Sequence, residues 1–228
     1  MQNLELQEAT MSGDLSKYDV FNSRLLVGAS YASNIELPVL ESVGYVPSGD
    51  LMSFTDARRS RSDISGSCVH FYQYDKYFEC VWRSPERYLP LFGRCEGVIG
   101  PDFSMYRNMP QAMQQWACFR SRAITYWLQC QGVPTVPNVR FSDSRSWSYC
   151  FEGLPLHAPL AIGSYGCLGT PEDRYWFEMG LDELVSRLSP RVLVVYGETP
   201  DDIFGRYKSK GIEVLGFQSE PARFHKRG

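Results

Sequence analysis

The residues whose types suit chemistry gather directly after a short apolar segment in the middle of the chain. The segment "GVIGP", residues 97 to 101, has the pattern of a buried strand, and Asp102, Phe103, Ser104 and Tyr106 follow it. A carboxylate in that position is costly to desolvate unless it is hydrogen-bonded, caps a helix or takes part in a reaction. Asp102 precedes the next predicted helix by too many residues to cap it. Two interpretations stay open: an Asx turn that holds the loop, or a general base, nucleophile or cation-stabilising carboxylate.

A second carboxylate follows the next predicted strand. The segment "TVPNVRF", residues 135 to 141, contains Arg140 and is followed by Ser142 and Asp143. Carboxylates from neighbouring strand ends commonly divide acid and base roles between them. We therefore take Asp102 and Asp143 as the expected catalytic pair.

The remaining candidates are expected to bind a substrate. They are Phe103, Ser104, Tyr106, Arg122, Arg140, Ser142, Ser164, Tyr165, Gly166 and Tyr196. Aromatic rings suit stacking on a base or sugar, and arginines suit phosphate or carboxylate, with core packing and ordinary ion pairs as the alternatives. The glycine-rich loop "GSYGCLGTPED", residues 163 to 173, runs into a predicted helix start. It suits either a phosphate cradle of backbone amides or a tight turn.

The sequence lacks the motifs of several common enzyme classes. It has no GxSxG, P-loop or HExxH motif, and its seven cysteines form no CxxC pair and are accompanied by only three histidines. We therefore expect no metal site and no cofactor. The cysteines are typical of buried free thiols in a reducing compartment.

Charge and hydropathy limit the partners. Residues 1 to 15 lack the pattern of a secretory signal, and no apolar run approaches the roughly 20 residues that cross a bilayer, so we expect a cytoplasmic protein with no membrane partner. The net charge of −3 gives no general attraction for nucleic acid. Nucleic-acid binding would therefore need a local basic patch, for which the segments 56 to 63 and 222 to 228 are the candidates. The alternatives are that the first is a solvated loop and the second a frayed terminus.

The elements that must position these residues alternate along the chain. Strands are predicted over residues 51 to 55, 68 to 74, 97 to 101, 135 to 141, 159 to 164, 191 to 197 and 212 to 217. Several are apolar at consecutive positions, which is typical of parallel strands covered on both faces. A long helix is predicted over residues 110 to 131 from its apolar stripe. Ser84-Pro85, Thr170-Pro171 and Thr199-Pro200 predict three further helix starts, because each places a hydroxyl, a proline and then acid in succession.

This alternation predicts an α/β fold of repeated βα units with a mostly parallel sheet. We favour an incomplete or degenerate (β/α) barrel, because the units are regular and no GxGxxG motif follows an early strand; an open doubly wound sheet is the alternative. In both folds, the carboxyl ends of the strands lie around one common opening, the mouth of the site. Residues 1 to 45 are expected to be an N-terminal extension packing on the core, 46 to 219 a single α/β domain, and 220 to 228 a basic tail.

Several blocks of the sequence resemble a known family. They are "PDFSMYR" at 101 to 107, "YWLQ" at 126 to 129, "VPTV" at 133 to 136 with "SD" at 142 and 143, "FEGLP" at 151 to 155 and "VVYG" at 194 to 197. In order and spacing they are similar to an uncharacterised family of phage, plasmid and other mobile-element proteins, over roughly residues 45 to 200. Arg140 departs from that pattern, which usually has an aromatic residue there. A looser similarity, at the level of the fold alone, is to barrel enzymes that exchange or cleave nucleobases with a strand-end carboxylate.

The resemblance and the strand-end residues together suggest a mobile-element enzyme. We expect it to act on a glycosidic or phosphate group of a nucleotide or nucleic acid, as a nucleoside or nucleotide glycosidase or transferase. One alternative is a non-catalytic protein that sequesters a nucleotide signal or inhibits a host defence protein, and another is a structural or DNA-handling accessory factor. The corresponding partner is a small nucleotide, a nucleic-acid component, or a host or phage protein.

Overall fold

The structure is a computed structural model that describes residues 19–219 of the 228-residue chain, so the basic segment 222 to 228 lies outside the described residues. Each of the seven predicted strands is present. In chain order they are β3 Asp50–Ser53, β4 Ser67–His70, β5 Gly97–Ile99, β6 Thr135–Val136, β7 Pro159–Gly163, β8 Val192–Tyr196 and β9 Glu213–Phe217. The fourth is much shorter than predicted, because Pro134 and Pro137 flank it and proline has no amide hydrogen to donate to a ladder.

The strands lie side by side in the order of the chain. One parallel sheet has the order β3-β4-β5-β6 and a second has the order β7-β8-β9. A parallel bridge between Asn138 and Ala161 links the two sheets, and the Val139 amide donates to the Ala161 carbonyl at 2.8 Å. The carboxyl ends of β3 to β9 therefore point the same way.

Side-chain contacts show that the linked sheets are curved. The rings of Tyr72, just after β4, and Tyr196, at the end of β8, stack with centroids 4.8 Å apart and an interplanar angle of 10°. Strands four steps apart in a flat sheet would lie about 19 Å apart, since neighbouring strands are spaced by about 4.8 Å. The sheets must therefore curl so that β4 and β8 approach each other across the inner face.

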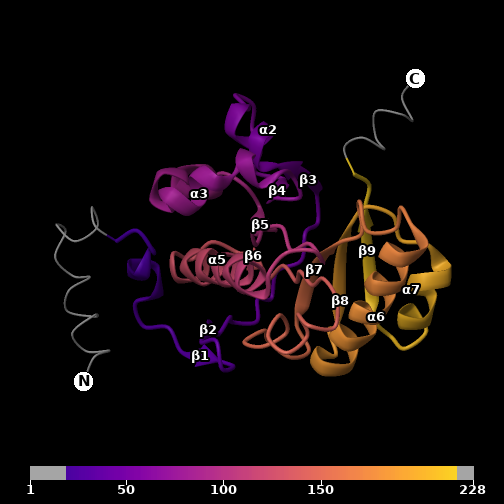
Figure 1. The fold of residues 1–228 in the computed structure, drawn as a ribbon. Coiled ribbons are helices and arrows are strands. Elements are labelled where there is room, and N and C mark those ends of the chain that lie inside the picture. Colours follow the sequence, from indigo (N-terminus) through magenta and orange to yellow (C-terminus); the bar gives the residue numbers. More distant parts are fainter. Residues whose placement is uncertain (1–18, 220–228) are drawn as a thin grey trace.

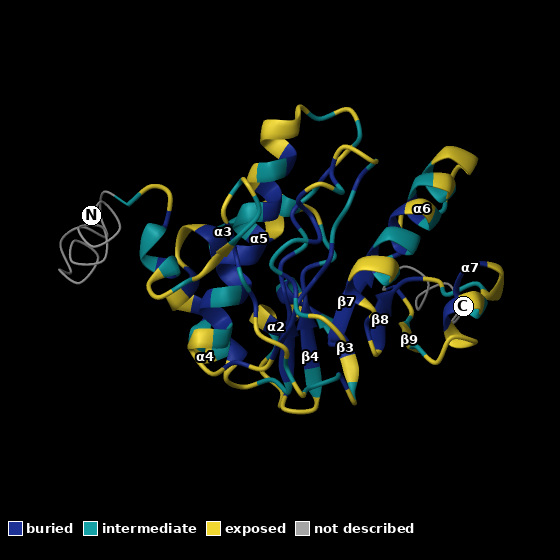
Figure 2. Cartoon of the chain, turned by 90° about the horizontal axis from the view of Figure 1, so that it is seen from below, coloured by how far each residue is buried: buried dark blue, intermediate teal, exposed yellow. Residues whose placement is uncertain are grey.

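Apolar side chains cover both faces of the strands. The inner face holds a small cluster with contributions from six strands, namely Leu51, Cys68, Ile99, Val136, Ala161, Val192, Val194 and Tyr196. Val69, Val98, Leu160 and Leu193 point the other way and join the larger core with the helices. Figure 2 shows buried strands between α3, α4 and α5 on one side and α6 and α7 on the other. Burial on two faces explains why these strands are apolar at consecutive positions.

The helices cover the outer face. They are α2 Phe54–Arg59, α3 Glu79–Arg83, α4 Leu89–Phe92, α5 Gln111–Cys130, α6 Pro171–Leu188 and α7 Asp201–Lys208. Figure 1 shows α6 and α7 beside β8 and β9, and α5 beside the strands of the first sheet. The long helix α5 agrees with its prediction to within a residue at each end. No helix within residues 19–219 is long and apolar enough to cross a membrane.

The three predicted helix starts differ in outcome. The start at Thr170 is confirmed, because its hydroxyl accepts a hydrogen bond from the Asp173 amide at 3.1 Å. The start at Ser84 is wrong in kind: a 3₁₀ turn, η4 Pro85–Tyr88, forms there and Ser84 makes no side-chain cap. The third helix begins at Asp201 with Pro200 as its N-cap, so Thr199 does not cap it.

The segment before β3 packs on the inner face of the sheets. Val43, Tyr45 and Val46 contact the inner cluster, and a Cβ on Gly97 would overlap the Tyr45 ring. Farther toward the N-terminus, a short antiparallel pair, β1 Tyr31–Ala32 and β2 Leu37–Pro38, leads the chain past α5. Within the described residues no pairing joins β9 to β3, so the fold is a mixed α/β architecture with parallel sheets and no closed barrel.

Candidate functional site

Asp102 lies at the floor of a cavity beyond the carboxyl end of β5. Its side chain is 11% exposed; one carboxylate oxygen accepts a hydrogen bond from the Asn138 amide at 2.8 Å, and the other lies 3.3 Å from Nη1 of Arg140. Burial raises the pKa of the Asp102 carboxyl above its usual value, although Arg140 and Asn138 act in the opposite direction. Asp102 is thus a desolvated carboxylate held by two side chains from the β6–β7 connection, and it does not form an Asx turn.

Tyrosines line the cavity above Asp102. The cavity has a volume of about 400 Å³, and its tyrosines are Tyr72, Tyr74, Tyr77, Tyr106, Tyr165 and Tyr196. Tyr72 also donates a hydrogen bond from its hydroxyl to Oδ1 of Asn138 at 2.8 Å, so it shares a partner with Asp102. We call this space the tyrosine cavity. Tyrosine side chains line its walls, and the pair formed by Asp102 and Arg140 lies at its floor.

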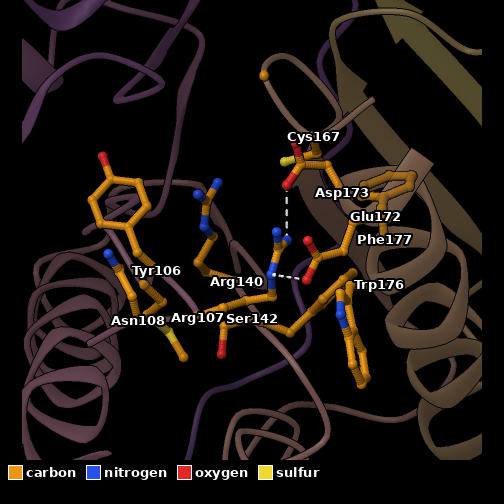
Figure 3. Close-up of a pocket in the computed structure, with 13 residues that line it drawn as sticks. Tyr106, Arg107, Asn108, Arg140, Ser142, Cys167, Glu172, Asp173, Trp176 and Phe177 are labelled. Carbon is orange, nitrogen blue, oxygen red and sulfur yellow. Dashed lines mark ion pairs between the residues drawn. The ribbon is translucent and has the colours of Figure 1, made fainter. Parts of the chain in front are cut away.

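A larger cavity of about 700 Å³ adjoins the first, and Tyr106, Arg140, Gly166 and Cys167 line both. Its far wall is the first part of α6, with Trp176 and Phe177, so we call it the α6 cavity. Figure 3 shows Tyr106 and Asn108 on one side of Arg140, and the α6 residues on the other. Arg140 therefore lies where the two cavities meet.

Ion pairs neutralise most of the charge in the α6 cavity. Arg107 lies 2.8 Å from Asp173 and 3.6 Å from Glu172, as the dashed lines in Figure 3 mark. Hydrogen bonds from Thr170 and Arg107 hold the pKa of the Asp173 carboxyl below its usual value. Both carboxylates pair with Arg107, which leaves Arg140 as the arginine facing both cavities.

The Asp143 carboxylate is bound by Arg145, a neighbour in the sequence. The carboxylate accepts hydrogen bonds from the guanidinium of Arg145, the shortest at 2.8 Å, and from the Arg145 amide at 3.0 Å. These hydrogen bonds hold the pKa of the Asp143 carboxyl below its usual value. Asp143 lines neither cavity, so the structure gives no support for the expected pairing with Asp102.

Another carboxylate, which the sequence did not single out, acts on Asp102. Asp75 begins η3 Asp75–Tyr77 and accepts hydrogen bonds from the amide of Ser104 at 3.2 Å and from its hydroxyl at 2.8 Å. The charge of Asp75 contributes to the raised pKa of Asp102. The sequence signal was weak, because the segment containing Asp75 directly continues a predicted strand. Ser104 lines the tyrosine cavity, but its hydroxyl donates to Asp75.

Several of the expected substrate-binding residues lie in the core. Phe103 is 1% exposed, packs on Phe78 and lies under the guanidinium of Arg120 at 3.9 Å. Arg122 is 2% exposed and donates to the carbonyls of Asn138 and Cys150. These contacts hold α5 against the chain after β6. They leave neither side chain facing the cavities.

Buried serines and the glycine-rich loop are also occupied by internal contacts. Ser142 donates to the side chain of Gln114, and Ser164 donates to the carbonyl of Glu198 at 2.7 Å. The amides of Ser164 and Tyr165 both donate to the Tyr196 carbonyl, and the Cys167 amide donates to the Ser164 carbonyl. A phosphate cradle would need those amides, so the tight-turn interpretation fits this loop better. Tyr165 and Gly166 still line the tyrosine cavity.

A metal centre finds no support in the part of the chain that the structure describes. Residues 19–219 contain no group of three or more histidine, cysteine, aspartate or glutamate side chains that could hold a metal ion. The cysteines within this range are free thiols.

Parallel strands, covering helices and an aromatic mouth around a buried carboxylate define an α/β protein with its candidate site at the strand ends. The chain belongs to the family described as a domain of unknown function, DUF4417, whose sequence pattern matches residues 29–218. This confirms the resemblance to an uncharacterised phage-related family.

Two phage proteins are similar to this chain. It is 36% identical over 181 residues to the Gene 1 protein of Mycobacterium phage D29, a match that covers 79% of this chain and 66% of the phage protein. It is 33% identical over 182 residues to the Gene 1 protein of Mycobacterium phage L5, covering 80% and 79% of the two chains. The chain therefore spans just under two thirds of the length of the D29 protein. No solved structure matches it.

Proposed function

We propose that this protein is a mobile-element enzyme that breaks the glycosidic bond of a nucleotide, with Asp102 as the principal carboxylate. The observation that carries the proposal is the burial of Asp102 on the floor of the tyrosine cavity. A buried ion pair is weak as a source of stability, so its presence at a cavity floor favours a functional role.

The arrangement suits a base stacked between tyrosines with its sugar over the floor. As the bond from the anomeric carbon to the base breaks, its electron pair leaves with the base and positive charge develops on the sugar. A carboxylate below the sugar stabilises that charge. Water then adds to the anomeric carbon and its proton goes to the base. Asp102 is suited to the role because its raised pKa makes it a stronger base than an exposed aspartate.

Breaking a glycosidic bond is better supported than reaction at a phosphate group. Three amides of the glycine-rich loop, those of Ser164, Tyr165 and Cys167, donate to backbone carbonyls and are taken from a phosphate. Arg140 is then the group left to contact a phosphate, beside a carboxylate that repels it. We therefore assign phosphate a binding role only.

The curved sheet is proposed to be an incomplete (β/α) barrel. The strand order without reversal and the contact between the ends of β4 and β8 support this proposal. A doubly wound sheet reverses its strand order at the binding crevice. The barrel places every strand end around one mouth, which is where both cavities lie.

The proposed reaction is tested by its product. The purified protein is incubated with nucleosides and nucleotides of each common base, and the mixture is analysed by mass spectrometry for free base. We expect release of free base from a nucleotide. Recovery of every compound intact after long incubation would refute the proposed reaction.

One observation favours a second candidate, a protein that binds a nucleotide without cleaving it. Both carboxylate oxygens of Asp102 already have partners, Asn138 and Arg140, as they would in a rigid binding pocket. Such a binder would carry its ligand through gel filtration and release it intact on denaturation. The same product analysis therefore distinguishes the two functions.

A further inference from the structure

The candidate site has two compartments, each large enough for a ligand of its own. The tyrosine cavity measures about 400 Å³ and the α6 cavity about 700 Å³. Each falls within the range of roughly 300 to 1,000 Å³ that is usual for small-molecule pockets. A single nucleoside over Asp102 would fill only the first compartment. The proposed function so far assigns nothing to the second.

The α6 cavity offers an aromatic surface of its own. Phe141, Trp176 and Phe177 line it, and Trp176 is partly exposed. The Trp176 ring makes T-shaped contacts with Tyr175, at a centroid distance of 5.1 Å, and with Trp147, at a centroid distance of 6.3 Å. These contacts fix the orientation of the indole. A partly exposed indole in a fixed orientation is suited to stacking against a second flat ring of a ligand.

Arg140 joins the two compartments and offers a contact for an anion. Its Nη1 lies against Asp102, and its side chain is 23% exposed. The exposed part of the side chain lines both compartments. An anionic group between two rings would lie at the junction and could accept from this guanidinium.

The charge around the junction limits how much phosphate can bind. Arg107 is already paired with Asp173 and Glu172, and Asp102 offsets Arg140. The whole chain has a net charge of −3. A long polyanion therefore meets no extended positive surface here, since nucleic-acid binding depends on many phosphate contacts. A short phosphate bridge needs only the one arginine.

We infer that the substrate is a dinucleotide, with one nucleoside in the tyrosine cavity, the second against Trp176, and the phosphate bridge beside Arg140. This inference rests on the proposed function for the reaction and adds the class of substrate. It assigns Trp176 as a specificity-determining residue that lies on the far side of the junction from Asp102.

Equilibrium dialysis with product analysis tests the inference. The wild type is dialysed against ribonucleoside 5′-monophosphates and against the corresponding symmetric dinucleoside diphosphates, and both bound ligand and free base are measured. We expect a dinucleotide to bind about tenfold or more tightly than its mononucleotide, because a second stacked base adds a comparable factor. In Trp176→Ala this preference should vanish while mononucleotide affinity stays within about twofold.

Matched variants exclude a general disturbance of α6. Met179→Ala removes an exposed α6 side chain that lines neither cavity and should keep the full preference. Trp176→Phe retains an aromatic face and should keep most of it. Equal affinity for mononucleotide and dinucleotide would overturn the inference, as would equal weakening of both by Trp176→Ala, or no binding of any probe. Tighter binding of a short oligonucleotide would overturn it in favour of nucleic acid.

The two proposals fail in different ways. A dinucleotide that binds through Trp176 and is recovered intact refutes the reaction but not the class of ligand. Free base released from mononucleotides, with no preference for dinucleotides, refutes the class of substrate and leaves the reaction standing.

Discussion

At the scale of single residues, the pair formed by Asp102 and Arg140 decides what the site can do. Burial raises the pKa of Asp102, so the folded protein holds this proton more tightly than the unfolded chain does. The contribution of Asp102 to stability therefore falls as the pH rises. The fall begins near the pKa of this carboxyl in the unfolded chain, about 4, and continues through its higher pKa in the folded protein. Arg140 limits that loss by supplying the opposite charge.

Replacing Arg140 should make the dependence of folding stability on pH larger and measurable. In Arg140→Met the Asp102 carboxylate loses its cation, and we expect a loss of about 3 kcal/mol of unfolding free energy at pH 8. The loss should be smaller at pH 5, where the carboxyl can take up a proton. Urea unfolding at the two pH values measures it. The double variant Arg140→Met/Asp102→Asn should recover most of the stability at pH 8, and a loss that does not change with pH would contradict this account.

The sequence identified Asp102 for a sound physical reason, since a carboxylate after a buried strand needs a partner or a use. It could not supply the partners. Asn138 and Arg140 come from the next strand connection, and Asp75 from the connection before. Asp143 satisfied the same strand-end rule, but in the structure Arg145, two residues away, takes up its carboxylate. Long-range contacts such as those of Asp102 with Asn138 and Arg140 are not encoded in local spacing.

At the scale of elements, the position of α6 depends on a glycine. A Cβ on Gly180 would overlap the ring of Phe141, which follows the β6 segment and lines the α6 cavity. Phe141 is held in turn by Phe151 and Phe177, with ring centroids 6.0 Å away in each case. The close approach of α6 therefore fixes one wall of the candidate site.

Two glycine-to-alanine variants test this packing. Gly180→Ala should lower the unfolding free energy by about 1 to 3 kcal/mol, because the added methyl group overpacks against Phe141. Gly205→Ala, in α7, meets no atom closer than 4.0 Å and should stabilise by about 0.5 to 1 kcal/mol through helix propensity. Thermal unfolding of both variants provides the comparison. Stabilisation by both would show that α6 has room at Gly180.

Element positions were largely predictable from hydrophobic pattern, whereas element ends were less so. The strands and α5 were found because burial on two faces and an apolar stripe leave clear patterns. Ser84-Pro85 and Thr199-Pro200 misled because the same residues also begin 3₁₀ turns and loops. The cap at Thr170 was confirmed, since there the hydroxyl does bond the helix amide.

At the scale of the whole molecule, curvature brings the strand ends together. Tyr72 and Tyr196 meet although β4 and β8 are separated by three strands in the order of the sheets. The alternation of strands and helices predicted parallel strands with a common mouth. It could not predict how far the sheets curl, because that depends on side chains on the inner face such as Cys68 and Ala161.

A double-mutant cycle for stability tests the curvature. Tyr72→Leu, Tyr196→Leu and the double variant should show a coupling energy of about 0.5 to 1.5 kcal/mol, as stacked aromatic pairs do. Urea unfolding of the four proteins measures it. Additive effects would place the two rings apart and would contradict the curved arrangement.

The proposed role of Asp102 in the reaction is tested by replacing each of the two strand-end carboxylates. Wild type, Asp102→Asn and Asp143→Asn are incubated with the nucleotide that the wild type cleaves, and the release of free base is timed. The account predicts a fall of about 10²- to 10⁴-fold in Asp102→Asn, with the nucleotide still bound, and little change in Asp143→Asn. Release at the wild-type rate by Asp102→Asn would contradict it.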